Sequence, residues 1–337
     1  MTRNPEALRS FMEGLETFRQ YVRTSSGEDL KRAASAFDDA LRTDPSFLPA
    51  RFHKAVVLTH ERKHSEAIQL LEELSNLGLP FQAEISHQLA FALAKTYQLP
   101  AILRATEELD RAEVAAKRRK RNDLILLVQA ARVYIHAILG GQRAGQPQDL
   151  EDRARTFLPM AIREGEELLR DRRLRRLDHA TLEAALVEVH NGLGIAYMRM
   201  GRNIHLFNMN RQDLWDKAKH HFSICLSYQP SDHAVLQNLG TLRLIQGHAL
   251  LKQGQDREAM EHYRIARDFF SRSVRVNPYD QFPHYRLSQI AALFREWDQA
   301  KASLVEARRQ RGAVSQEAFA ILEHALETRD SSGLLET

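Results

Sequence analysis

The sequence predicts an all-α protein built as a stack of helix pairs, and three observations support this prediction. The chain has only 15 glycines and 10 prolines in 337 residues, too few for the many turns of a β-sandwich or propeller. Apolar residues recur at helical spacing in successive pairs of segments. Within a pair, two small residues stand about three helical turns plus a tight turn apart, as Ala55 and Ala67 do. Ser288 and Ala300 repeat this spacing near the C-terminus.

The composition is that of a folded globular protein, with 43% hydrophobic and 27% charged residues and a formal net charge of +4. The single cysteine, Cys225, excludes an internal disulfide and a multi-cysteine metal site, and its place in a helix predicts a buried thiol. Neither an apolar run of about 18 residues nor the apolar core of a signal peptide is present. We therefore expect a cytoplasmic protein without a membrane partner.

The helix pairs follow one another along the chain to residue 312. We assign them to residues 4–45, 46–79, 80–119, 122–176, 178–230, 231–278 and 280–312. Prolines mark several ends, at Pro45, Pro80, Pro230 and Pro278, because proline disfavours a helix at the residue before it. A helix over 315–327 is expected to cap the open end, and residues 329–337 to form a flexible tail.

The first and fourth pairs need longer connections than the others. In the first pair, Ser25-Ser26-Gly27 predicts a turn between Gly14 and Ala33. In the fourth pair, the turn covers the glycine-rich residues 140–147.

The fifth and sixth pairs carry the most specific pattern. The fifth contains Leu193-Gly194, Tyr197, Ala218, Phe222, Cys225 and Pro230, and the sixth contains Leu239-Gly240, Ala266, Phe270, Ser273 and Pro278. This order resembles the tetratricopeptide repeat (TPR), in which Leu-Gly, Tyr, Ala, Phe, Ala and Pro follow one another within about 34 residues. The resemblance implies an α-solenoid, a single right-handed superhelix over residues 1–328, whose concave groove is lined by the first helix of each pair.

Both of these pairs depart from the spacing of the repeat. Gly194 and Ala218 are 24 residues apart and Gly240 and Ala266 are 26 apart, where the family has about twelve. Residues 203–210 indicate a loop in the fifth pair, whereas the apolar periodicity through 248–251 favours longer helices in the sixth.

The resemblance also implies that side chains two positions before the small residue, and their neighbours, face the groove. Most of these positions carry hydrogen-bonding groups, which suit an extended peptide because a side-chain amide both donates to and accepts from a backbone. The predicted groove residues are His53, Gln88, Gln129, Asn191, Asn238, Tyr285 and Arg286. A solvent-facing groove is polar whether or not it binds anything, so peptide binding is a hypothesis.

The resemblance does not extend to the clamp with which some family members grip acidic chaperone tails. Only Asn238 and Arg286 match that clamp. Ile195 and Phe282 stand where asparagine and lysine belong, which argues against binding of such a tail.

Two basic runs fall where one helix pair ends and the next begins. They are Lys117, Arg118, Arg119, Lys120 and Arg121, followed by Arg172, Arg173, Arg175 and Arg176. Such turns share one edge of a solenoid, so we expect the runs to lie side by side, and we name them the basic edge. Arginine outnumbers lysine 38 to 10, which favours bidentate contacts to phosphate or carboxylate. Contact with nucleic acid or an acidic protein, a nuclear import signal, and solvated cations at helix ends all fit this pattern.

One string matches a catalytic motif. His60-Glu61-Arg62-Lys63-His64 has the His-Glu-x-x-His spacing of zinc metalloproteases. That chemistry needs both histidines on one face of one helix, whereas the repeat pattern places His60 at the end of one helix and His64 at the start of the next. We therefore expect polar turn residues here, no cofactor and no enzymatic activity.

The first helix carries more apolar side chains than one buried stripe requires. They are Leu8, Phe11, Met12, Leu15, Phe18, Tyr21 and Val22. The excess predicts contact with another chain, including self-association.

We therefore predict a non-enzymatic scaffold or adaptor that binds an extended peptide or partner protein in its groove. The alternative is a regulatory subunit of a larger assembly that contacts nucleic acid or an acidic partner through the basic edge.

Overall fold

The computed structural model describes residues 2, 4–142, 145–310, 312 and 314–335. This part of the chain forms fifteen α-helices and three short 3-10 helices and has no β-strand. The prediction of an all-α protein made of paired helices is confirmed. The chain divides into two compact units, residues 1–230 (unit 1) and 231–337 (unit 2), and each has its own packed helices. The single superhelix over residues 1–328 stays a prediction.

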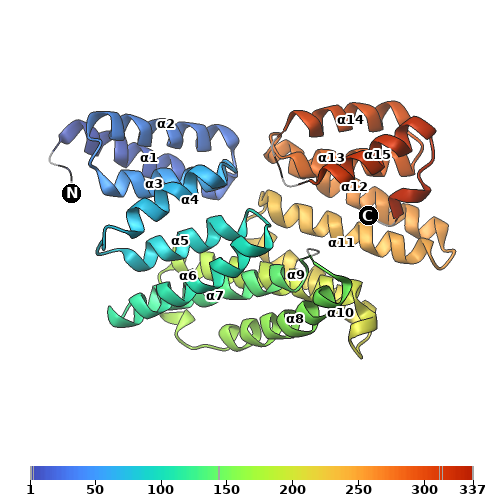
Figure 1. The fold of residues 1–337 in the computed structure, drawn as a ribbon, viewed down its shortest axis with the longest axis horizontal. Helices are drawn as coiled ribbons and strands as arrows, with labels where there is room; N and C mark the ends of the chain where they lie inside the picture. Colours follow the sequence, from blue (N-terminus) through green and yellow to red (C-terminus); the bar gives the residue numbers. More distant parts are fainter. Residues whose placement is uncertain (1, 3, 143–144, 311, 313, 336–337) are drawn as a thin grey trace. The chain divides into compact units, whose positions relative to one another are not determined.

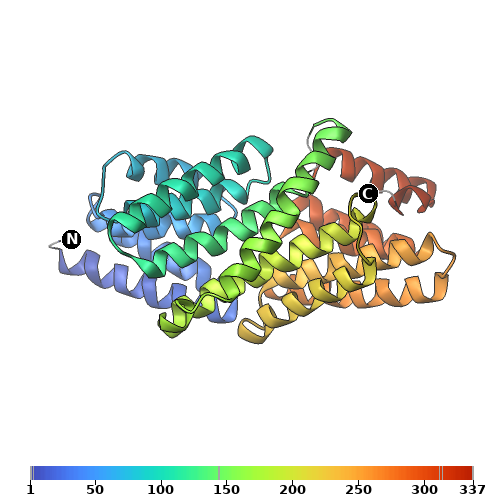
Figure 2. The ribbon, with the colours of Figure 1, turned by 90° about the horizontal axis from the view of Figure 1, so that it is seen from below.

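Unit 1 contains ten α-helices in five antiparallel pairs. They are α1 (Pro5–Thr24), α2 (Gly27–Thr43), α3 (Leu48–His60), α4 (His64–Ser75), α5 (Gln82–Ala94), α6 (Leu99–Arg118), α7 (Asn122–Leu139), α8 (Pro147–Leu169), α9 (His179–Arg202) and α10 (Arg211–Tyr228). Each helix packs against the next, and each odd-numbered helix also packs against the following odd-numbered helix (Figure 1). Figure 2 shows the same pairs from below. This double contact is the stacking expected of a solenoid, in which each repeat buries its apolar face on its neighbours.

Unit 2 continues the same pattern with fewer helices. They are α11 (His233–Leu251), α12 (Asp256–Val276), α13 (Gln281–Leu293), α14 (Trp297–Arg309) and α15 (Gln316–Thr328), followed by the 3-10 helix η3 (Ser332–Leu335). The helix α15 packs on both α13 and α14, as the predicted capping helix should. Residues 329–337 are predicted to be a flexible tail, but Leu334 is fully buried, because η3 turns back onto the unit.

The same side-chain contact holds the most TPR-like pairs together. A glycine in the first helix lies directly under a phenylalanine of the second. A β-carbon added at Gly194 would stand 2.5 Å from the Phe222 ring, and one at Gly240 would stand 2.8 Å from the Phe270 ring. These distances are shorter than van der Waals contact, so the small residue sets how closely the two helices approach. Gly14 and Phe37 make this contact in the first pair.

The wide spacings of the fifth and sixth pairs have two different origins. In the fifth pair, α9 extends over 24 residues, and a connection with the short helix η2 (Ile204–Leu206) leads to α10. In the sixth pair, α11 and α12 are simply long, at 19 and 21 residues, and a tight turn joins them. Both predictions, a loop in the first case and longer helices in the second, are confirmed.

The helix α7 is the one described helix that is long and apolar enough to cross a membrane, by length and composition only. Most of it is buried between α5, α8 and α9. Because a core helix must be apolar on more than one side, this burial accounts for its composition.

Candidate functional site

The odd-numbered helices of each unit share a face that is turned away from the even-numbered helices, and we call it the inner face. In unit 1, α5, α7 and α9 are successive neighbours. Gln88 lies on α5, Gln129 on α7 and Asn191 on α9, and all three are half-buried. At the next position of α9, Gly192 has no side chain, and a β-carbon there would stand 2.8 Å from the backbone nitrogen of Tyr134. The three half-buried amides thus lie on three adjoining helices, and Asn191 stands one position before Gly192, the position that corresponds to Gln88 and Gln129.

His53 differs from these amides because it packs between helices. Its ring stacks on Phe37 at 5.7 Å between centroids and lies 5.6 Å from the ring of Phe11. Burial lowers the pKa of His53 to about 4, and the charge of Arg19 acts in the same direction. The imidazole is therefore neutral at pH 7 and serves as part of the packing between the first two helix pairs.

The inner face of unit 1 also holds an ionisable cluster that the sequence did not reveal. Lys95, at the end of α5, donates a hydrogen bond of 2.8 Å to the hydroxyl of Tyr134 on α7. The same ammonium lies 4.7 Å from the ring centres of Tyr134 and Phe91. Glu188, on α9, completes the cluster, and burial raises its pKa to about 7, although the charge of Lys95 opposes this. The members come from three helices, so only the tertiary structure brings them together.

In unit 2 the structure corrects one predicted groove residue. Tyr285 is 3% exposed, its ring packs edge-on against Phe319, and its hydroxyl donates to the carbonyl of Ala318. It belongs to the core between α13 and α15 and cannot line a groove. Sequence reasoning placed it in the groove because it adjoins Arg286, but one residue along a helix is a rotation of about 100°.

The other two predicted groove residues of unit 2 are half-buried, Asn238 on α11 and Arg286 on α13. The guanidinium of Arg286 lies over the rings of Phe282 and Tyr285 and donates a hydrogen bond of 2.6 Å to Oε1 of Gln289. The amide of Gln289, which is fully buried, donates in turn to the carbonyl of Leu334 at 2.9 Å.

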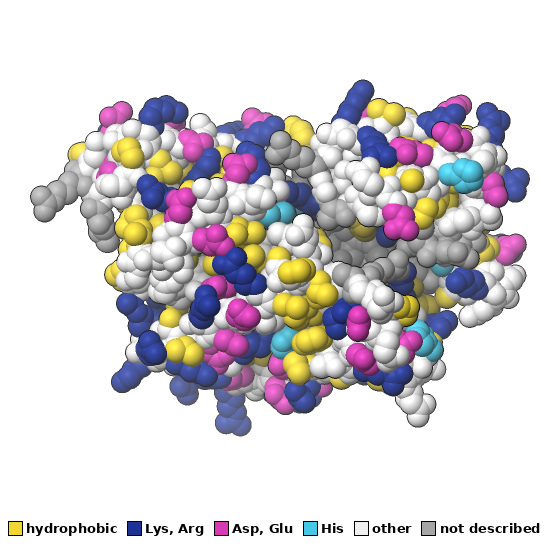
Figure 3. All heavy atoms as spheres, viewed as in Figure 1, with side chains coloured by type: hydrophobic (Ala, Val, Ile, Leu, Met, Phe, Trp, Pro, Cys, Tyr) yellow, Lys and Arg dark blue, Asp and Glu magenta, His cyan; other side chains and the backbone are white. Residues whose placement is uncertain are grey.

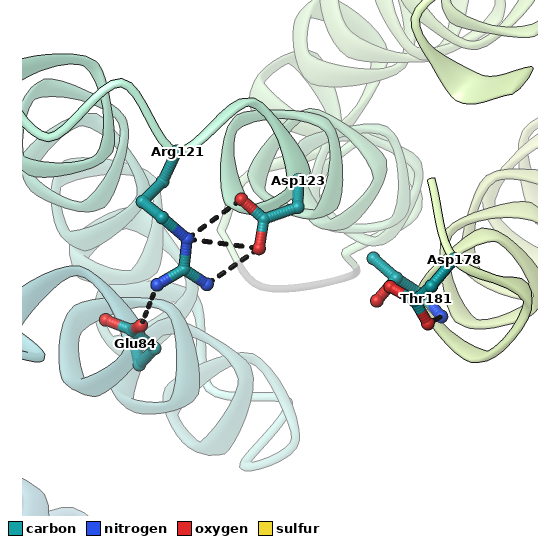
Figure 4. A network of polar contacts seen from close by, with 5 residues as sticks. All are labelled: Glu84, Arg121, Asp123, Asp178 and Thr181. Carbon is teal, nitrogen blue, oxygen red and sulfur yellow. Dashed lines mark hydrogen bonds and ion pairs between the residues drawn. The ribbon is translucent and has the colours of Figure 1, made fainter. Parts of the chain in front are cut away.

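The basic edge lies at the ends of α6 and α8 and at the starts of α7 and α9. Arg121 contacts two carboxylates, donating to Asp123 at 2.6 Å and to Glu84 at 3.1 Å (Figure 4). Its hydrogen bonds to Asp123 raise the pKa of Arg121 and lower that of Asp123. Asp178 and Thr181, at the start of α9, which packs on α7, are labelled in the same view. That the two basic runs lie side by side stays a prediction.

Each run has some charges paired and three exposed charges for which no ion pair is described, and in the second run these are Arg172, Arg175 and Arg176. Lys117 pairs with Glu113 and Arg173 with Asp171. Arg118, Arg119 and Lys120 are exposed, and within the described residues we find no ion pair that involves them. Lys and Arg side chains gather at the lower left of Figure 3, over the ends of α6 and α7.

The His-Glu-x-x-His string straddles a turn, as predicted. The helix α3 ends at His60 and α4 begins at His64, with Arg62 between them in the left-handed region at φ 62°. Nδ1 of His60 lies 3.3 Å from the hydroxyl of Tyr21. Across the described part of the chain, no three side chains of the metal-binding types converge.

A second histidine pair is buried between α9 and α10. The Nδ1 atoms of His190 and His221 are 2.8 Å apart, so one neutral ring donates to the other. The ring of Tyr197 stacks on His221, and its hydroxyl donates to Glu166 at 2.7 Å. Burial lowers the pKa of both histidines to about 4.

The first helix keeps part of its excess apolar surface exposed. Leu8 is 47%, Met12 54% and Val22 41% exposed, whereas Phe11, Leu15 and Phe18 pack against the core of the first pair and Tyr21 is buried in it. Cys225 is buried, as predicted.

No protein-family model and no curated protein sequence matches the chain. Solved structures with similar backbones include a tetratricopeptide repeat protein from Parabacteroides merdae, which is 13% identical with a TM-score of 0.46, over 95% of this chain and 99% of that one. Another is a monomeric mutant of IFIT1 with Gppp-AAAA, 13% identical with a TM-score of 0.46, over 90% of this chain and 71% of that one. A third is the TPR2AB domain of yeast Sti1 in complex with pHSP90, which is 11% identical with a TM-score of 0.28, over 98% of this chain and 97% of that one. The fold class rests on the chain's own stacked helix pairs and their repeated glycine–phenylalanine contacts, which give each unit an all-α fold of solenoid type.

Proposed function

We propose that the protein is a non-enzymatic scaffold that binds an extended segment of a partner protein on the inner face of unit 1. The observation that carries the proposal is the set of amides Gln88, Gln129 and Asn191, one on each of three adjoining helices. Packed helices lie about 8–10 Å apart, so the three amides span about 20 Å. An extended chain covers that distance in about six residues, and its backbone groups can pair with side-chain amides in either direction.

The test is affinity purification from the native source with mass spectrometry of the retained proteins. Wild type is compared with a variant that carries Gln88→Ala, Gln129→Ala and Asn191→Ala. We expect a partner that wild type retains and the triple variant loses, at low and high salt alike. Equal retention by both proteins contradicts the proposal.

The basic edge supports a second candidate function, contact with nucleic acid or an acidic protein. Arg118, Arg119 and Lys120 form an exposed run without a described ion pair, and Arg172, Arg175 and Arg176 of the second run are likewise exposed and without one. Binding through phosphate contacts weakens steeply with salt because counterions are released. The variant Arg118→Ala/Arg119→Ala/Lys120→Ala tests this candidate. If the partner is lost from this variant and is also lost from wild type at high salt, the partner binds at the basic edge.

A further inference from the structure

The last described residues of the chain fold back onto unit 2. The helix α15 ends at Thr328, the next residue Arg329 turns the backbone with a φ of 54°, and the amide of Asp330 donates to the carbonyl of Ala325. The short helix η3 then places Leu334 among the buried side chains of α13, α14 and α15, which include Tyr285 and Phe319. A terminal segment of four residues is thus anchored by one leucine side chain.

The backbone of this segment accepts a hydrogen bond from a buried side chain of α13, Gln289. Ser288 donates to the carbonyl of Ala300 on α14, so that side of α13 faces the even-numbered helix. Arg286 and Gln289 are rotated from Ser288 by about 160° and about 100°, so neither side chain points toward α14, and Gln289 faces η3. Arg286 was predicted to line the groove; here it is the residue that orients Gln289.

The direction of these hydrogen bonds follows from the chemistry of the groups. A guanidinium can only donate, so the 2.6 Å contact from Arg286 fixes Oε1 of Gln289 toward the arginine. Nε2 of Gln289 is thereby aimed at the backbone carbonyl of Leu334, 2.9 Å away. The side chain of Gln289 is fully buried, so this amide is set to recognise one carbonyl next to one apolar side chain.

We propose that this part of α13 and α15 is a binding site for a peptide leucine, which takes the leucine side chain into the core and its carbonyl onto Gln289. The chain's own Leu334 occupies the site, so a partner segment that presents a leucine binds only when η3 leaves. This inference rests on the proposed function, to which it adds a second peptide site and its regulation. Short segments held by few long-range contacts open locally at low cost, which is what such displacement requires.

The test uses a labelled peptide of residues 329–337, blocked at both ends, and a protein that ends at Asp330. Fluorescence anisotropy should show saturable binding to the shortened protein. Binding to the full chain should be at least about tenfold weaker, because the tethered segment competes at a high effective concentration. Circular dichroism confirms that the shortened protein is folded.

Peptide variants separate the leucine site from unspecific contact. Leu334→Ala in the peptide should weaken binding by at least about tenfold, the effect of losing a buried leucine side chain. Gly333→Ala is the matched control, because a β-carbon at Gly333 meets nothing within 4 Å, and it should bind like the natural peptide. In the protein, Gln289→Leu should weaken binding to a similar extent.

If the shortened protein does not fold, the full chain with Leu334→Ala serves instead, since it keeps the segment but empties the leucine site. The proposal is overturned if neither folded variant binds the peptide, if the full wild-type chain binds equally well, or if the Leu334→Ala peptide binds unchanged. Loss of a partner from the unit 1 triple variant would still support the proposed function in that case. If the peptide binds to unit 2 but the unit 1 triple variant loses no partner, the leucine site is supported and the proposed function is not.

Discussion

At the scale of single residues, glycine sets the distance between paired helices. A β-carbon at Gly240 would stand 2.8 Å from the Phe270 ring, which is itself fully buried. We expect Gly240→Ala to lower the free energy of unfolding by about 1–3 kcal/mol, because the ring must move in a close-packed core. Urea denaturation measures this loss. Gly333→Ala is the control and should be neutral, since its site is open.

A second residue-scale prediction concerns Glu188, whose burial raises its pKa to about 7 from an ordinary value of 4.5. In the unfolded chain the carboxyl ionises near pH 4.5, whereas the folded protein keeps it neutral up to about pH 7. The favourable contribution of Glu188 is therefore complete below pH 4.5 and is lost as the pH rises to 7.

Between pH 4.5 and pH 7.5, we expect the unfolding free energy of Glu188→Gln to rise by about 1–3 kcal/mol relative to that of wild type. This range is kept below the full value of the pKa shift because the residue is half-buried and solvent screens its charge. Urea titrations at several pH values measure the difference. Glu167→Gln, at an exposed position of α8, should stay parallel to wild type. A Glu188→Gln curve that is also parallel to wild type contradicts the assigned burial.

At the scale of elements, one turn geometry recurs between paired helices. Arg62, Gly254 and Arg295 all have positive φ, at 62°, 75° and 61°. The next residue of each donates to a carbonyl five positions back, from Lys63 to Leu58 and from Glu296 to Ala291, which is the Schellman arrangement.

Glycine adopts this backbone more readily than a residue with a β-carbon, by about 1 kcal/mol. We expect Arg295→Gly, at an exposed position, to raise the unfolding free energy by up to about 1 kcal/mol. Gly254→Ala should lower it by a similar amount. In thermal melts, the melting temperature should therefore rise for Arg295→Gly and fall for Gly254→Ala. Shifts in the same direction would show that the turns are not equivalent.

This turn explains part of what the sequence could and could not predict. The small-residue and phenylalanine positions identified the helix pairs, because those contacts are steric and recur in the same order from pair to pair. In two of the three turns the residue with positive φ is an arginine, so no glycine in the sequence indicates the turn. The orientation of Tyr285 was missed for another reason, since α15 covers it and that contact is not encoded in the local pattern. Lys95 and Glu188 could not be connected, because three whole helices, α6, α7 and α8, separate them along the chain.

At the scale of the whole molecule, buried neutral histidines make stability depend on pH. Burial lowers the pKa to about 4 in six histidines: His53, His64, His87, His190, His221 and His248. Their ordinary pKa is 6.5, so the unfolded chain takes up protons first as the pH falls. The stabilisation from these groups is present above pH 6.5 and is lost as the pH falls toward 4.

At pH 5 each such histidine lowers the free energy of unfolding by up to about 2 kcal/mol relative to pH 7. We therefore expect the urea midpoint to fall steeply between pH 7 and pH 5. Replacing one buried ring should reduce that slope, as in His190→Gln. His179→Gln is the control, because the His179 side chain is 90% exposed. A midpoint that does not change over this range contradicts the assignment of neutral buried rings.

Site-specific photo-crosslinking shows whether a partner segment lies on the inner face of unit 1. A photoreactive phenylalanine analogue replaces Gln129 on the inner face, Val114 on the exposed side of α6, or Arg119 on the basic edge. We predict that irradiation of native cells links a partner protein at position 129 and leaves position 114 unlinked. A partner linked at position 119 alone, or equally at all three positions, contradicts the claim.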